Sequence, residues 1–83
     1  MKKNEIIALI RGSTGKNEKL PLADLLKLND VANVFFDINR ETNEYFYRIK
    51  IDDLIDKEFE EGILTENGWK LSPDENEILF FIN

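Results

Sequence analysis

The chain contains no histidine and no cysteine, so the side chains most often used for acid–base, thiol and metal chemistry are missing. One glycine-rich run, Gly12-Ser13-Thr14-Gly15-Lys16, has the composition of a phosphate-binding loop. Such a loop needs a glycine five residues before its second glycine and a Ser or Thr after its lysine. Ile10 and Asn17 occupy these two positions. We therefore expect an ordinary polar loop here, with no bound nucleotide.

Six acidic residues lie close together in the last third of the chain: Asp52, Asp53, Asp56, Glu58, Glu60 and Glu61. On a helix, those spaced four apart would share one face. Catalytic carboxylates need burial or a specific neighbour that separates their pKa values, and a solvated helix face supplies neither. The run Asp74-Glu75-Asn76-Glu77 lacks the glycine and the final glutamate of a calcium loop. We expect no enzymatic activity, no metal site and no cofactor.

The net charge of −6 is distributed unevenly along the chain. Residues 1–50 carry nine Lys/Arg against seven Asp/Glu, whereas residues 51–83 carry two against ten. Such an asymmetry concerns surface electrostatics, and therefore partners. Glu58, Glu60 and Glu61 would also lie near a helix C-terminus, where the helix dipole disfavours acids. The pattern favours a small non-catalytic module that binds a basic protein surface through its acidic last third. Ordinary solubility is the competing explanation.

Nucleic acid is not an expected direct partner, because the acidic residues would be repelled by phosphate groups. The same charge density allows another function, in which the acids of the Asp52 helix imitate phosphates and occupy the DNA- or RNA-binding groove of another protein. Charge density is the only feature of the sequence that supports this alternative.

Length and composition predict one domain over residues 1–83, with 42% hydrophobic residues available for a core. The longest apolar run, Ile6–Ile10, is too short to cross a bilayer and is followed by no small-residue cleavage site. We expect a cytoplasmic protein. The richness in Ile, Asn, Lys and Glu is typical of a bacterial or phage genome.

Two helices are predicted in the first third of the chain. Asn4 can cap a helix over residues 5–11, which Gly12 would end, although the β-branched pair Ile6-Ile7 leaves a strand as an alternative. Pro21 suits the first turn of a second helix that ends near Asn29. Its apolar stripe would consist of Leu22, Leu25 and Leu26, at spacings of three and four residues.

A β-hairpin is the clearest pattern. Residues 32–38 and 45–51 are both rich in aromatic and β-branched side chains and are separated by the polar residues 39–44. A turn centred on Glu41-Thr42 would pair Ile38 with Tyr45, Phe36 with Tyr47, Val34 with Ile49 and Ala32 with Ile51. This register places the strongest apolar residues on one face, and a slip of one residue would not.

The last third predicts a helix and a second hairpin. Asp52 can cap a helix that ends at Glu61 before Gly62, although a continuation towards Asn67 is an alternative. Residues 69–71 and 77–82 flank a turn at residues 72–76, and Ile63–Thr65 could add a further short strand. The order α-α-β-β-α-β-β predicts an α+β fold: two antiparallel hairpins in one sheet, packed with two to three short helices.

Both faces of this sheet would carry aromatic surface. Phe35 and Phe46 lie opposite the main apolar face of the first hairpin, and Phe81 lies on the minor face of the last strand. Either helices cover both faces, or one face stays open as an interface for a partner or a second copy. We therefore expect an acidic ridge around an aromatic surface, formed by the Asp52 helix and by the turn at residues 74–77. The candidate partner-binding residues are Asp52, Asp53, Asp56, Glu58, Glu60, Glu61, Phe35, Phe46 and Phe81.

Overall fold

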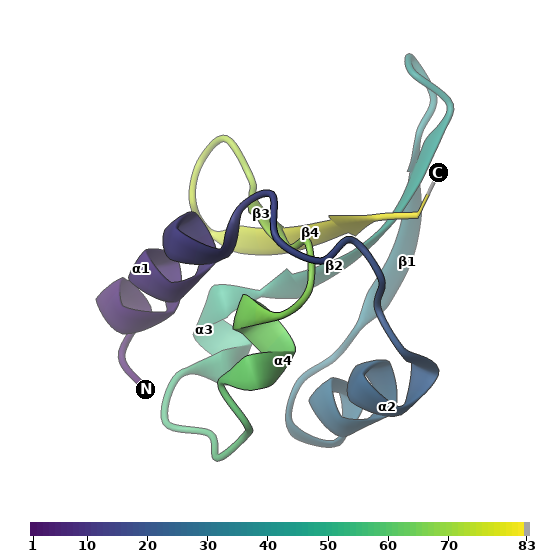
Figure 1. Cartoon of the computed structure of the whole chain (residues 1–83). Coiled ribbons are helices and arrows are strands. Elements are labelled where there is room, and N and C mark those ends of the chain that lie inside the picture. The colour runs from purple at the N-terminus through teal and green to yellow at the C-terminus, as the bar shows by residue number, and fades with distance from the viewer. Residues whose placement is uncertain (83) are drawn as a thin grey trace.

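Two antiparallel hairpins form one four-stranded sheet in the computed structural model, which describes residues 1–82 (Figure 1). Four helices accompany the sheet within these residues. The predicted α+β class is confirmed, and so is the joining of both hairpins in one sheet. In chain order the elements are α1 (Lys3–Ser13), α2 (Leu22–Val31), β1 (Phe35–Asn39), β2 (Glu44–Lys50), α3 (Ile51–Leu54), α4 (Gly62–Thr65), β3 (Lys70–Leu71) and β4 (Glu77–Phe81).

The first hairpin has the predicted register. Ile38 lies opposite Tyr45 and Phe36 opposite Tyr47, and residues 40–43 form the turn. The pairing ends earlier than predicted, because β1 begins at Phe35 and Ile51 already belongs to α3. The predicted pairs of Val34 with Ile49 and of Ala32 with Ile51 are therefore not part of the ladder.

The second hairpin is also confirmed, and it joins the first through β4. The strand order is β1-β2-β4-β3, so β1 and β3 are the two edges. Tyr47 lies opposite Phe80, and Ile49 lies opposite Ile78. The backbone N–H of Ser72 donates to the Glu77 carbonyl at 2.9 Å and closes the turn between β3 and β4.

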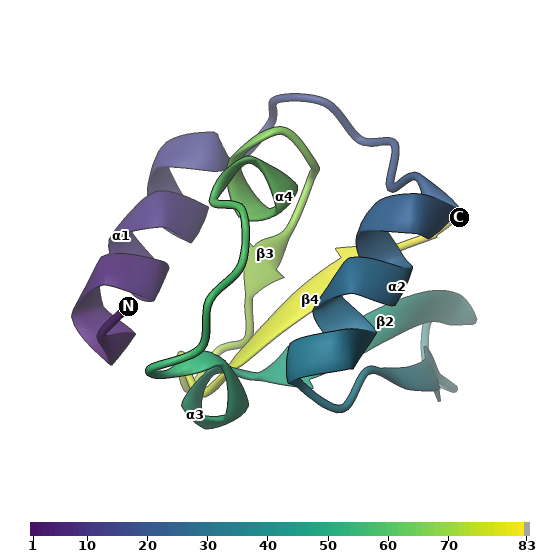
Figure 2. The same ribbon diagram turned by 90° about the horizontal axis from the view of Figure 1, so that it is seen from below.

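All four helices lie on one side of the sheet, and we call this side of the sheet its inner face (Figures 1 and 2). Ile10 of α1, Leu28 of α2 and Leu64 of α4 pack with Ile49 and Ile78 in one hydrophobic core. Of the two alternatives, the one in which helices cover both faces is therefore wrong. The core residues of the helices gather with Ile49 and Ile78 on one side of the sheet, whereas the other side carries charged residues at its centre.

The first helix is longer than its predicted bounds. It begins at Lys3, with Lys2 instead of Asn4 at the N-cap, and the Lys2 backbone N–H donates to Glu5 Oε1 at 3.4 Å. Gly12 lies inside the last turn and does not end the helix. Ser13 keeps that turn helical, because its buried hydroxyl lies 3.0 and 3.1 Å from the carbonyls of Ile10 and Leu64.

The second helix uses a different leucine from those predicted. Leu28 is fully buried, whereas Leu22 is 69% exposed and Leu26 is 55% exposed. Leu25 lies between these extremes. Only the flank of α2 that carries Leu25 and Leu28 therefore faces the core.

The predicted helix over residues 52–61 is wrong. The chain leaves α3 after Leu54, and Asp56 has a positive φ of 61°. Its backbone N–H donates to the Met1 carbonyl at 3.1 Å instead of continuing the helix. Helical structure resumes at Gly62, so the alternative of a strand at residues 63–65 is also wrong. The break lets Leu54 and Leu64 both reach the core.

None of the helices in residues 1–82 is long and apolar enough to cross a membrane.

Candidate interaction surface

The face of the sheet without helices, which we call the outer face, is the first candidate site. Side chains alternate between the two faces along each strand. Since Ile49, Ile78 and Phe80 are buried on the inner face, the ladder registers assign the intervening residues to the outer one. These residues are Phe35, Asp37, Asn39, Glu44, Phe46, Arg48, Lys50, Lys70, Glu77, Leu79 and Phe81.

The three aromatic residues of the predicted site all lie on the outer face. Phe46 and Phe81 are directly opposite each other across β2 and β4, with ring centroids 5.4 Å apart. Phe35 is the diagonal neighbour of Phe46 on β1 and is 39% exposed. Phe46 and Phe81 are partly exposed. The sheet therefore brings Phe35, Phe46 and Phe81 together as one aromatic surface.

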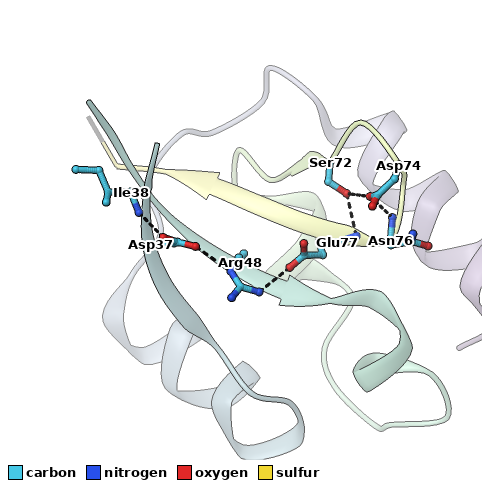
Figure 3. A network of polar contacts seen from close by, with 7 residues as sticks. All are labelled: Asp37, Ile38, Arg48, Ser72, Asp74, Asn76 and Glu77. Atoms are coloured by element: carbon cyan, nitrogen blue, oxygen red, sulfur yellow. Dashed lines mark hydrogen bonds and ion pairs between the residues drawn. The ribbon is translucent and has the colours of Figure 1, made fainter. Parts of the chain in front are cut away.

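Arg48 lies at the centre of this surface and holds two carboxylates in place (Figure 3). Its Nε donates to Asp37 Oδ2 at 3.2 Å, and its Nη1 donates to Glu77 Oε2 at 2.9 Å. The guanidinium also lies 4.7 Å from the centroid of the Phe35 ring, in a cation–π contact. The hydrogen bond with Glu77, followed by the charge of Glu77 and the contact with Asp37, raises the pKa of Arg48 above its ordinary value. Arg48 is therefore a fixed cation.

A shallow hollow of about 550 Å³ lies beside Arg48, between the outer face and the turn before β4. Phe46 and Leu79 form its apolar part, and Asp74 stands on its turn side. Asp74 Oδ1 accepts from the Ser72 hydroxyl at 2.6 Å and from the Asn76 backbone N–H at 3.1 Å (Figure 3). These two hydrogen bonds, the first being the stronger cause, lower the pKa of Asp74.

The outer face is electrically balanced although the chain as a whole is acidic. It carries the three acids Asp37, Glu44 and Glu77 and the three bases Arg48, Lys50 and Lys70. Lys70 lies 5.8 Å from the centroid of the Phe81 ring. Aromatic rings together with arginine are typical of the energetic centres of protein interfaces.

The six acidic candidates lie elsewhere. Asp52 and Asp53 belong to α3, Asp56 to the following turn, and Glu58, Glu60 and Glu61 to the connection before α4. This connection loops away from the sheet, on the helix side of the molecule (Figure 1). The expected acidic ridge around the aromatic surface is therefore wrong for these residues, whereas Asp74 and Glu77 of the other predicted acidic segment do lie beside Phe46. They also share no single helix, which the nucleic-acid mimic would have used.

The structure adds Asp30 of α2 to the acidic set. Asp30 lines one shallow hollow with Asp52 and Asp53 and another with Glu58 and Glu60. Lys27 reaches Glu60 at 3.5 Å, in an exposed ion pair that contributes little stability. Within residues 1–82, no three or more carboxylates are grouped so that they could hold a metal ion.

A second exposed apolar region is present that the sequence patterns did not predict. Phe36 is 60% exposed and Tyr45 is 44% exposed on the inner face, where the first hairpin extends beyond the helices (Figure 1). A groove of about 560 Å³ lies between α2 and the sheet, with Leu22, Leu25 and Ile82 among its lining residues. The length of the hairpin relative to the helix layer decides this exposure, and alternation along a strand carries no information about it.

No protein-family model, curated protein or solved structure matches this chain.

Proposed function

We propose that this protein is a non-catalytic binding module that associates with a second copy of itself through the outer face. The observation that carries the proposal is the uncovered sheet face, on which Phe35, Phe46 and Phe81 surround a fixed Arg48. All four helices cover the inner face and leave this aromatic surface to solvent.

Charge balance favours a second copy as the occupant. Three acids and three bases on one face can pair with their counterparts when the face meets itself across a two-fold axis. A strongly basic partner would instead meet Arg48, Lys50 and Lys70 and lose part of its attraction. Two such faces would stack about 10 Å apart, as in a β-sandwich, with both helix layers outside.

Backbone NMR shifts recorded on dilution test this proposal. We expect spectra between about 200 μM and about 5 μM to change at residues of the outer face, above all Phe46, Arg48, Leu79 and Phe81, because association in the micromolar range buries them. Shifts confined to other surfaces, or spectra that do not change with concentration, would contradict it.

A basic partner bound by the acidic surface is the second candidate function. It is favoured by Asp30, which extends the acids of residues 52–61 onto α2. The triple variant Glu58→Gln, Glu60→Gln and Glu61→Gln should weaken the binding of a polylysine probe at about 50 mM salt. The matched control changes the exposed acids Glu5, Glu18 and Glu41 to Gln. Equal weakening in both triple variants would reject a localised acidic site.

A further inference from the structure

We propose that the free edge of β1 is a second contact surface, which pairs antiparallel with β1 of another copy of this chain. The surface differs from the outer face, and the inference does not depend on the proposed function. β1 is the first strand in the sheet order and pairs only with β2, so its far side has no strand beside it in residues 1–82.

The direction of the backbone groups shows which residues face this edge. The Ile82 N–H donates to the Tyr45 carbonyl at 2.9 Å, so the backbone of Tyr45 faces β4. Backbone direction alternates along a strand, so Phe46, the next residue of β2, faces β1. Asp37 lies opposite Phe46 and therefore faces β2. Its neighbours Phe36 and Ile38 consequently direct their N–H and C=O groups to the free edge.

The side chains at this edge favour pairing more than most exposed edges do. Natural proteins protect edge strands with lysine, proline or a covering segment. β1 has the sequence Phe-Phe-Asp-Ile-Asn, with one charge and no proline. Phe36 is 60% exposed, and its ring stacks on the exposed ring of Tyr45 at 5.8 Å. A strand added here would bury this aromatic pair.

Charge favours one register between the two copies over a neighbouring one. Placing Phe36 opposite Phe36 of the second copy also places Val34 opposite Ile38, and it sets Asp37 opposite Phe35. The guanidinium of Arg48 already lies over Phe35 at 4.7 Å, so Asp37 of the second copy would approach a cation. The register that places Phe36 opposite Ile38 of the second copy would also place Asp37 opposite Asp37. Like charges directly opposite each other are destabilising.

Asp37 also keeps this association weak. Its Oδ1 accepts from the Ile38 N–H at 2.8 Å (Figure 3), which is one of the donors that face the edge. Pairing requires the Ile38 N–H to leave Asp37 Oδ1 and to donate instead to the Val34 carbonyl of the second copy. We therefore expect a dissociation constant on the order of 0.5 mM, in the weak range of protein association.

The test uses the Phe81→Asp variant, in which a charge within the aromatic surface of the outer face blocks association there. Phe46→Asp replaces it if circular dichroism shows that Phe81→Asp is unfolded. Sedimentation velocity should show rather more than half of the chains in dimers at about 1 mM and almost only monomers at about 20 μM. At the higher concentration, hydrogen exchange of the Phe36 amide should become slower, reaching about half its monomer rate or less.

Phe36→Lys in the same background should remain monomeric at every concentration, because a lysine on an edge strand opposes pairing. Leu22→Lys is the matched control, since Leu22 is 69% exposed on α2, and it should dimerise as before. A monomer at about 1 mM in both outer-face variants, or a dimer that survives Phe36→Lys, would overturn the edge pairing. Neither result would affect the dilution shifts expected for the outer face.

Discussion

Arg48 holds the outer face together at the scale of single residues. Its guanidinium joins carboxylates from β1 and β4 and covers the Phe35 ring, while its own side chain is 29% exposed. Hydrogen bonds to charged groups contribute about 1.5–3 kcal/mol when buried, and solvent reduces this contribution. The residue therefore stabilises the pairing of three strands as well as the shape of the surface.

Replacing Arg48 with methionine should lower the free energy of unfolding by about 1–2 kcal/mol, because Asp37 and Glu77 lose their shared cation. Urea denaturation measures the loss. Lys50→Met is the matched control on the same strand and face, and it should change stability by less than about 0.5 kcal/mol. Equal effects of the two substitutions would show that the Arg48 contacts contribute nothing specific.

Asp74 gives a prediction on pH. Hydrogen bonds from Ser72 and Asn76 hold its folded pKa below the ordinary value, so ionised Asp74 stabilises the fold at any pH above that ordinary value. This contribution is lost as the pH falls through the lower, folded pKa. In Ser72→Ala the pKa of Asp74 should rise towards the ordinary value, as a carboxyl-carbon NMR titration would measure. An unchanged pKa would contradict the role of the Ser72 hydroxyl.

The aromatic half of the site could be predicted from the sequence, whereas its polar half could not. Strand alternation in the first hairpin fixes Phe35 and Phe46 on one face, whichever partner strand follows. The bonds of Arg48 to Asp37 and Glu77 need the order β1-β2-β4, and no local pattern specifies which hairpin strands become neighbours. The contact between Phe81 and Phe46 also depends on this strand order, so it could not be predicted from local patterns either.

Helix α2 provides a test at the scale of secondary-structure elements. Leu28→Ala should cost about 2–4 kcal/mol, since Leu28 is fully buried and its removal leaves a cavity. Leu26→Ala should change stability by no more than about 0.5 kcal/mol, because Leu26 is 55% exposed. The two substitutions delete the same atoms from the same helix. Thermal or urea unfolding that ranks them in the opposite order would contradict the placement of α2.

The break after α3 gives a second test at this scale. Asp56 has a φ of 61°, a conformation that glycine adopts without the steric cost paid by other residues. Asp56→Gly should therefore leave stability unchanged or raise it by up to about 1 kcal/mol. A continuous helix over residues 52–61 would instead be weakened by glycine. Asp53→Gly, inside α3, is the control that should be destabilising in urea denaturation.

The helix predicted over residues 52–61 is wrong because local sequence patterns do not record tertiary contacts. Capping by Asp52 and the spacing of Leu54, Ile55 and Phe59 both favour a helix. Tertiary contacts override these preferences, because Leu54 and Leu64 reach the same core from two separate turns and Asp56 bonds to Met1. Met1 and Asp56 are distant in the sequence, and no window of neighbouring residues contains this contact.

At the scale of the whole molecule, residues 1–82 form one core and a sheet with two edges and one uncovered face. Hairpins and helices could be predicted as separate elements, but the side of the sheet that each helix covers depends on how all of them share that core. This arrangement separates the acidic residues 52–61 from the aromatic outer face (Figure 1). The outer face is therefore balanced in charge, and its expected partner is a second copy of the chain.

The most direct test of the outer face is the mass of the protein in solution at about 50 μM, about a tenth of the dissociation constant expected for edge pairing, so that few chains pair through β1. Sedimentation velocity should show the wild type at twice its monomer mass of 9.7 kDa. Phe46→Asp should be a folded monomer, and Leu26→Asp, which changes an exposed leucine on α2, should remain dimeric. A monomeric wild type, or a Phe46→Asp variant as dimeric as the wild type, would contradict the outer face as the contact surface.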